Sequence, residues 1–220
     1  MAWGAAARVA AEIATVHVGA ILLAAGLSRR MGAANKLLLS LDGVPMVARV
    51  AAAIRAAGLP MMVVLGHEAD AVRAALSGYR ALAGADGSAD DGAPPAFIVA
   101  DEHARGIGHS LSAGMVAVPP AWTGALVCLA DMPFVGADML RRLAAALVAP
   151  DSVAVPVCAG RRGNPVAWGR DWFPRLAALK GDTGGRALLA SAPAVEITAD
   201  AAVLRDFDTP GDLAHWRHET

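Results

Sequence analysis

Short apolar runs alternate with longer amphipathic runs along most of this chain, and that alternation restricts the possible folds more than any other feature. The apolar runs predict strands at residues 18–23, 61–65, 97–100, 125–129 and 153–157. The amphipathic runs predict helices at residues 46–57, 69–76, 111–118 and 137–147. Strands that alternate with helices indicate an α/β sandwich of three layers, in which helices cover both faces of a mostly parallel sheet. Ligands of such sheets bind beyond the carboxyl ends of the strands, so the residues directly after each apolar run are the candidates for chemistry.

The length of 220 residues fits one sizeable domain with a well-buried core. We assign residues 17–220 to this domain and treat the alanine-rich residues 1–16 as an N-terminal extension to which no role is assigned. These first residues lack a basic region followed by a cleavage site, so no signal peptide is expected. Residues 83–95 are rich in Gly, Ala, Asp and Pro, and we expect a surface loop there because a strand resumes directly after them.

Charge and composition exclude some partners. The formal net charge is −1, whereas nucleic-acid binders usually carry a strong basic excess, so a nucleic acid is not expected as a partner. The apolar residues 18–27 are interrupted by glycines and too few to span a bilayer, so no membrane partner is expected either. Cys128 and Cys158 both lie in apolar runs and are interpreted as small buried side chains of a cytoplasmic protein.

The loop after the first apolar run has the residues that a phosphate group needs. Gly26 permits a tight turn with close backbone approach, so main-chain N–H groups can point at phosphate oxygens. Arg30 and Lys36 add two positive charges to the same loop. The loop is not a Walker A motif, because Gly32 is not followed by lysine, and the dinucleotide pattern G-x-G-x-x-G is also absent. An ordinary strand-to-helix turn with basic surface residues remains the alternative.

Acidic residues follow two other apolar runs. Asp131 comes directly after the run at residues 125–129, where a carboxylate suits Mg²⁺; the alternative is a turn or helix-capping aspartate. Near the C-terminus, residues 204–208 read as a strand on which Asp206 and Asp208 point the same way. Asp208 is the better metal ligand of the two, although it also reads as the cap of a final helix.

Four motifs occur in one order: L-A-A-G-x-S-x-R-M-G followed by N-K, then L-A-D-M-P, G-N-P, and D-x-D-T-P-x-D-L. Together they resemble the nucleotidyltransferases that build the molybdenum-cofactor dinucleotides, over about residues 18–213. The resemblance implies a Rossmann-like, glycosyltransferase-A-like sheet, a triphosphate held on residues 24–36, and Mg²⁺ held by Asp131 and Asp208. It also implies that Lys36, Arg30 and Asp131 are catalytic. The residues expected to bind the nucleotide are Leu23, Ala24, Ala25, Gly26, Ser28, Arg30, Lys36, Gly106 and Ser110.

The identity of the base depends on Ala25 and Gly26. This pair looks like the cytidylyl branch of the group, since the guanylyl branch more often has two adjacent glycines there. The resemblance therefore implies CTP as the nucleotide, with GTP as the alternative, and a molybdopterin-type cofactor as the acceptor. Residues 106–110, which include His109, resemble a loop that lies by the nucleotide in relatives, although His109 could equally be a surface residue.

Two further segments fit the acceptor side. Residues 160–165 place two arginines on a glycine-containing turn, which could hold the acceptor phosphate. Residues 180–186 form a second glycine-rich loop that opens a helix and would cover the pterin. An ordinary hairpin and an ordinary helix start remain the alternatives. The residues expected to bind the acceptor are Arg162, Gly163, Asn164, Pro165, Asp182, Gly184 and Arg186.

The expected chemistry needs charge stabilisation more than proton transfer. An acceptor phosphate is already anionic, so its oxygen attacks without a general base, and the protein has to hold two anions together and stabilise the departing pyrophosphate. Mg²⁺ would polarise the α-phosphate, while Arg30 and Lys36 would stabilise pyrophosphate. A nucleotidyltransferase for a sugar- or alcohol-phosphate, or a chaperone-like cofactor-binding module, are the alternatives. A molybdenum hydroxylase or its maturation chaperone is the expected recipient of the product.

Overall fold

A mixed sheet forms the centre of the computed structural model, which describes residues 17–28, 35–80 and 94–207. The sheet has eight strands in the order β10-β7-β9-β6-β1-β4-β5, with β8 paired to β7. Their bounds are β1 (Val18–Ala24), β4 (Met61–Leu65), β5 (Ala96–Val99), β6 (Gly124–Leu129), β7 (Val153–Cys158), β8 (Arg161–Arg162), β9 (Val166–Gly169) and β10 (Ala194–Thr198). A separate two-stranded hairpin is formed by β2 (Ser40–Leu41) and β3 (Val44–Pro45).

Most strand pairs in the sheet are parallel, as the sequence predicts. β1 pairs in parallel with β4 on one side and with β6 on the other, so that Leu22 lies opposite both Val63 and Cys128. β9 runs antiparallel to both of its neighbours, β6 and β7. The sequence analysis predicted β7 but no strand at β9 or β10, so the two strands on either side of β7 were not anticipated.

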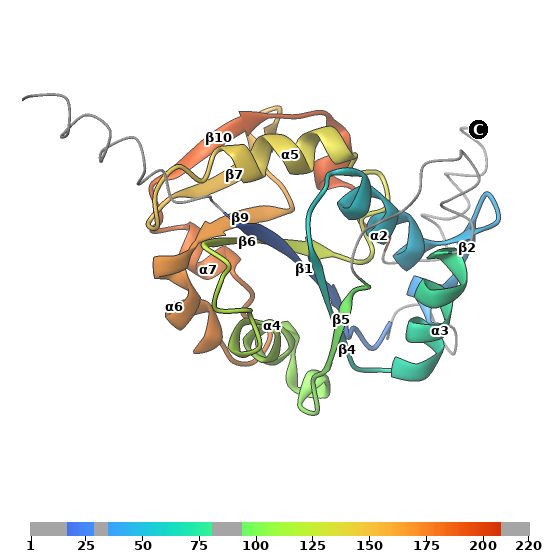
Figure 1. Cartoon of the computed structure of the whole chain (residues 1–220). Coiled ribbons are helices and arrows are strands. Elements are labelled where there is room, and N and C mark those ends of the chain that lie inside the picture. The colour runs from blue at the N-terminus through green and yellow to red at the C-terminus, as the bar shows by residue number, and fades with distance from the viewer. Residues whose placement is uncertain (1–16, 29–34, 81–93, 208–220) are drawn as a thin grey trace, which may run out of the picture.

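Helices cover both faces of the sheet, which confirms the three-layer arrangement (Figure 1). The helices of one face are α2 (Met46–Ala56), α3 (Ala69–Arg80) and α5 (Ala137–Ala145). Those of the other face are α4 (Ile107–Val116), α6 (Phe173–Ala177) and α7 (Arg186–Leu189). Four short 3₁₀ helices complete the described elements: η3 (Lys36–Leu38), η4 (His103–Arg105), η5 (Arg170–Trp172) and η6 (Ala201–Leu204). In the part of the chain covered by the structure, no helix combines the length and the apolar composition that a bilayer crossing requires.

The pleat of β1 divides its side chains between two cores. Leu22 packs with α2, α3 and α5 in one core, whereas Ile21 and Leu23 pack with α4, α6 and α7 in the other. Strands buried on both faces read as continuous apolar runs, which is why β1 was visible in the sequence. Cys128 of β6 lies in the first core, and burial raises the pKa of its thiol to about 12, as expected for a structural cysteine.

Three predicted elements differ from the structure by more than two residues. α3 extends to Arg80, whereas its helix was predicted to end at residue 76. α4 begins at Ile107 rather than at residue 111. Gly106, which separates η4 from α4, has a φ of +121°, a conformation that glycine adopts readily. The strand predicted at residues 204–208 is wrong. The Asp200 carboxylate accepts a hydrogen bond from the Ala202 backbone N–H (2.9 Å), which caps η6, and no strand follows η6 as far as Phe207.

The order of the strands fixes where a ligand should bind. From β1 the chain proceeds outward through β4 and β5, then returns to the other side of β1 as β6. The topological switch point therefore lies between β1 and β6. The crevice beyond the carboxyl ends of these two strands is the expected binding position in a sheet of this kind.

Candidate functional site

An ion pair joins the loops that follow β1 and β6. The Lys36 ammonium Nζ lies 2.7 Å from Asp131 Oδ2, although the two residues are 95 positions apart. Their side chains are 11 % and 21 % exposed. Lys36 begins η3, and Asp131 lies in the turn that follows β6. The rule about strand ends predicted that both residues lie at one edge of the sheet. The structure places them there, with the Lys36 ammonium beside the Asp131 carboxylate at the switch point.

Local hydrogen bonds fix the backbone around Lys36. The Lys36 N–H donates to Ser28 Oγ (3.2 Å), and the Leu37 N–H donates to Asn35 Oδ1 (3.1 Å). Asn35 is the N-cap of η3 and is 5 % exposed, and its buried Nδ2 has no hydrogen-bond partner among the residues that the structure describes. The cap orients the first turn from which the Lys36 side chain leaves. Asn35 was part of the quoted N-K motif, but the sequence analysis gave it no role.

Asp131 is also joined to the C-terminal segment. The Phe207 N–H donates to the Asp131 carbonyl oxygen (3.1 Å), and the Phe207 ring packs on Phe134 at a centroid distance of 5.5 Å. Asp208 itself and Arg30 lie outside the described residues, but Phe207 brings the chain that leads to Asp208 to the side of Asp131. Asp131 is not a helix cap, because α5 has Gly136 as its N-cap.

A cavity of about 360 Å³ opens at this edge, and we call it the first cavity. Its lining consists of Leu23, Ala25, Gly26, Leu27, Ser28, Lys36, Leu37, His103, Ala104, Gly106, Ile107, Ser110, Leu129, Asp131 and Asp182. Seven of the nine residues expected to bind nucleotide are therefore brought together here. Of the other two, Ala24 ends β1, is 1 % exposed and packs in the core, and Arg30 is not described.

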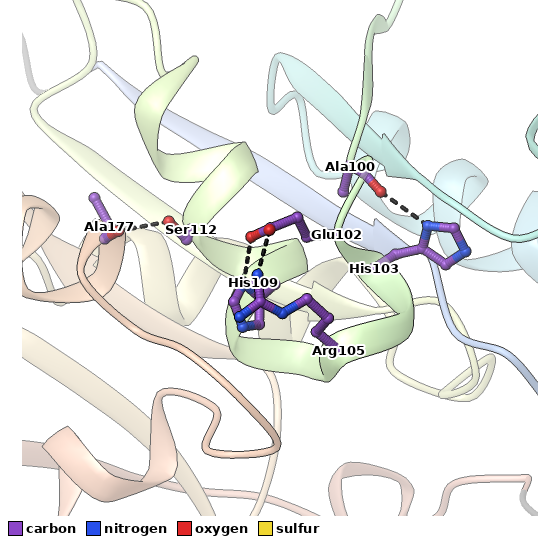
Figure 2. A network of polar contacts seen from close by, with 7 residues as sticks. All are labelled: Ala100, Glu102, His103, Arg105, His109, Ser112 and Ala177. Carbon is purple, nitrogen blue, oxygen red and sulfur yellow. Dashed lines mark hydrogen bonds and ion pairs between the residues drawn. The ribbon is translucent and has the colours of Figure 1, made fainter.

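The wall of the first cavity between β5 and α4 is held by its own polar contacts (Figure 2). The Glu102 carboxylate forms ion pairs with the guanidinium of Arg105 and, at 3.0 Å, with His109 Nδ1. The hydrogen bond from Arg105 lowers the pKa of Glu102 below its usual value. His103 Nδ1 lies 2.9 Å from the Ala100 carbonyl oxygen. His109 thus belongs to the support of this wall, and it does not line the first cavity.

A second cavity of about 500 Å³ lies beside the first. It is lined by Leu23, Ile107, Leu111, Val127, Leu129, Arg162, Gly163, Asn164, Val166, Trp168, Asp182, Gly184, Gly185, Arg186, Leu189 and Ala190. Six of the seven residues expected to bind the acceptor are among them. Pro165 is the exception, since it lies against Cys128, Met132 and Leu140 on the other side of the sheet.

The Arg162 guanidinium, which lines the second cavity, already has hydrogen-bond partners within the protein. Its Nε and Nη2 lie 3.0 and 2.9 Å from Glu196 Oε1, and its Nη1 donates to the Leu189 carbonyl oxygen (3.3 Å). A guanidinium has five N–H donors, so these contacts leave donors for an anionic ligand. The side chain is 39 % exposed, unlike the more enclosed Lys36.

The two cavities share four lining residues: Leu23, Ile107, Leu129 and Asp182. Two ligands bound in the cavities would therefore meet over these residues. The arrangement suits a reaction that joins two anionic molecules, with Lys36 on one side and Arg162 and Arg186 on the other. Among the described residues, no cluster of three or more His, Cys, Asp or Glu side chains could hold a metal by itself.

Sequence reasoning missed several lining residues. His103 follows β5, so the rule about strand ends would have included it if it had been applied to that strand. Ile107 lies in the segment 106–110 that the resemblance indicated, although it was not named as a binding residue. Leu129 was seen only as the end of a strand. Trp168 and Leu189 could not be assigned because β9 and the short α7 carry no clear periodic pattern.

Comparisons with known proteins agree with this geometry. Residues 20–197 match the model of the MobA-like NTP transferase domain family. The purine catabolism protein PucB of Bacillus subtilis strain 168 is 34 % identical over 200 residues, which cover 86 % of this chain and 91 % of PucB.

Solved structures give the same result. The crystal structure of Rv0371c from Mycobacterium tuberculosis H37Rv is 31 % identical with a TM-score of 0.73, and covers 91 % of this chain and 97 % of its own. Rv0371c is also known as a complex with manganese, which matches with 28 % identity and a TM-score of 0.71 over 93 % of this chain and all of the other. These neighbours confirm the expected glycosyltransferase-A-like fold. With its match over most of the sequence, the chain belongs to the MobA-like NTP transferase family and is a nucleotidyltransferase.

Proposed function

We propose that this enzyme transfers CMP from CTP to a molybdopterin-type molybdenum cofactor, forming the cytosine dinucleotide cofactor and pyrophosphate with the help of Mg²⁺. The observation that carries the proposal is the pair of adjoining cavities at the switch point. The first contains the Lys36–Asp131 ion pair, and the second contains Arg162 and Arg186. Family membership implies a nucleoside triphosphate as substrate, and the first cavity is the position for it.

The second cavity supports a large acceptor that is partly apolar. It is bigger than the first, and its lining includes Val127, Val166 and the indole of Trp168 beside the two arginines. A ligand that combines an extended ring system with one phosphate fits such a lining better than a small polar sugar phosphate. PucB is named a purine catabolism protein. We infer that the product of this enzyme goes to a molybdenum hydroxylase or to its maturation chaperone.

The described residues would act by position and charge. An acceptor phosphate oxygen attacks the α-phosphorus of the nucleotide, and the bond from that phosphorus to the pyrophosphate oxygen breaks. Lys36, assisted by Arg30, stabilises the negative charge on the departing pyrophosphate, and Arg162 and Arg186 hold the acceptor phosphate. No general base is required, because the attacking oxygen is already anionic.

Asp131 is a described oxygen donor that suits a divalent cation at this site. Asp131 lines the first cavity, and the N–H of Phe207, the residue before Asp208 in the sequence, donates to the Asp131 carbonyl oxygen. Asp131 and Asp208 would hold Mg²⁺, which binds one or two carboxylates together with phosphate oxygens. A divalent ion bound there would polarise the α-phosphate. The manganese complex of Rv0371c supports a divalent ion in this fold.

We assign the preference for CTP over GTP to Ala25. Its side chain lines the first cavity and is 3 % exposed, whereas a glycine at this position would leave more room. A pyrimidine needs less space than a purine, so the methyl group of Ala25 favours cytosine.

Pyrophosphate release tests the proposal directly. The purified protein is given Mg²⁺ and molybdopterin-type cofactor with either CTP or GTP, and the product is identified by mass spectrometry. We expect release and dinucleotide formation with CTP and much less with GTP. Faster turnover with GTP would transfer the proposal to the guanylyl reaction. Turnover with a sugar phosphate in place of the cofactor would contradict the assigned acceptor.

A further inference from the structure

The boundary between the two cavities is mostly apolar. We call its four residues, Leu23, Ile107, Leu129 and Asp182, the seam, because they line both cavities. Leu23 is 8 % exposed and packs in the core, but Ile107 is 40 % exposed. A large apolar side chain exposed between two polar ligand positions requires an explanation, because solvent exposure of an aliphatic side chain is unfavourable.

Close packing from the 180–184 loop fixes the position of Ile107. Gly106 has φ +121°, and a Cβ there would lie 2.4 Å from the backbone of Gly181. The Gly108 N–H donates to the Gly181 carbonyl oxygen (2.8 Å). Ile107 Cγ2 lies 3.5 Å from the position that a Cβ on Gly184 would occupy, which is ordinary van der Waals contact. Ile107 therefore lies beside the loop that carries Asp182.

The opposite side of the same segment is held by the contacts of Figure 2. Glu102 binds both Arg105, which precedes Ile107, and His109, which follows it. The segment is thus attached to its own turn on one side and to the 180–184 loop on the other. Attachment on both sides holds the backbone of Ile107 in one position while ligands bind and dissociate.

We propose that Ile107 excludes water from the α-phosphorus and so determines whether the nucleotidyl group goes to the acceptor or to water. The inference rests on the proposed function only in placing the nucleotide in the first cavity and the acceptor in the second. In the productive step an acceptor phosphate oxygen bonds to the α-phosphorus as the pyrophosphate bond breaks. In the side reaction a water oxygen forms that bond, its proton passes to solvent, and the products are nucleoside monophosphate and pyrophosphate.

Exclusion of water is a recognised way in which a closed site suppresses hydrolysis. A water that displaces pyrophosphate in line attacks the phosphorus from the side on which the acceptor would arrive, which is the side of the seam. Three of the four seam residues offer water no hydrogen bond, and among these Ile107 is the most exposed and hence the easiest to alter without disturbing the core.

The test compares Ile107→Thr with Val116→Thr and Ile107→Val. Threonine retains the branched shape but adds a hydroxyl group. Val116 lies on the same helix, is 76 % exposed and lines neither cavity, so it controls for threonine in α4. The full-length protein is incubated with Mg²⁺ and CTP, with and without molybdopterin-type cofactor, and the yields of monophosphate, dinucleotide and pyrophosphate are measured by chromatography.

We expect Ile107→Thr to raise the ratio of monophosphate to dinucleotide about fourfold, because the added hydroxyl group can hold a water at the seam with the net stabilisation of a typical hydrogen bond. Acceptor-free hydrolysis should rise with it, while the melting temperature stays unchanged. Ile107→Val, which adds no hydroxyl group, should raise the ratio less than Ile107→Thr does, and Val116→Thr should behave like the wild type.

The proposal is overturned if Ile107→Thr hydrolyses CTP no faster than Val116→Thr. It is also overturned if all variants gain hydrolysis equally. Failure of the proposed function would look different. The wild type would form no dinucleotide with the molybdopterin cofactor, and acceptor-free hydrolysis with the nucleotide that binds would still report on Ile107.

Discussion

The two cavities differ in how their charged residues are held. In the first, Lys36 and Asp131 are mostly enclosed, lie 2.7 Å apart and are carried by the loops after two neighbouring parallel strands. In the second, Arg162 and Glu196 are 39 % and 51 % exposed and are carried by a short hairpin strand and an edge strand. Enclosed charge pairs are sensitive to the loss of one partner, whereas exposed pairs contribute little to stability. The first cavity therefore has a fixed charge arrangement and the second an adjustable one.

This difference suits the two ligands. The reacting phosphates of the nucleotide must be placed accurately, because small displacements at the reacting centre are costly for rate. An acceptor bound partly through apolar contacts tolerates more movement of its arginine partners. We therefore expect substitutions in the first cavity to lower kcat and those in the second to raise the KM of the acceptor.

The largest effect is expected for Asp131→Ala. Loss of this carboxylate removes the proposed metal ligand and the partner of Lys36, so kcat should fall at least about 100-fold, as for the loss of a key electrostatic group in other enzymes. Asp131 lies in a turn rather than in the core, so the circular dichroism spectrum should be unchanged. Asp138→Ala, at an exposed position in the first turn of α5, is the matched control. Normal Mg²⁺-dependent pyrophosphate release by Asp131→Ala would remove Asp131 from the mechanism.

A smaller effect is expected for Arg162→Ala. We expect the KM for the acceptor to rise about tenfold, because a hydrogen bond to a charged group contributes roughly 1.5–3 kcal/mol, part of which solvent restores at this exposed position. The KM for CTP should not change. Arg161→Ala is the control, since Arg161 is its neighbour in β8 but does not line the second cavity. Steady-state kinetics with each substrate varied in turn measure both KM values. An equal rise in the two would contradict the assignment of Arg162 to the acceptor alone.

The sequence allowed the first cavity to be predicted better than the second, for a physical reason. β1 and β6 are buried on both faces, so they appear as continuous apolar runs, and the residues after them must meet at one edge of a parallel sheet. From the sequence, this rule therefore predicts that Lys36 and Asp131 lie at the same edge of the sheet.

The second cavity depends on elements with weak sequence signals. β9 has four residues and lies antiparallel between two longer strands, and its place in the sheet is decided by tertiary pairing with β6 and β7 rather than by local pattern. The motif residues Arg162 and Asn164 could be named from the resemblance. Trp168, whose indole lines the same cavity, could not. The wrong strand at residues 204–208 has a similar cause, because the Asp200 cap that turns the chain into η6 outweighs the local apolar pattern.

The smallest effect on activity is expected for substitutions of Asn35, and it tests whether the first cavity depends on a side-chain cap that the second lacks. Asn35 caps η3 with its side chain, whereas α7 beside the second cavity begins at Gly185 with no side-chain cap.

Removing a side-chain cap costs about 1 kcal/mol of stability. The cost for Asn35→Ala should be at most about that value, because the substitution also removes the buried Nδ2, which has no hydrogen-bond partner in the described part of the chain. Urea denaturation measures this loss, and Asn35→Ser, which keeps a capping oxygen, should recover most of it. If the cap positions Lys36, the KM for CTP rises in Asn35→Ala and returns toward the wild-type value in Asn35→Ser, while the KM for the acceptor stays constant. A stability loss without any change in the KM for CTP would show that Asn35 supports η3 but not the position of Lys36.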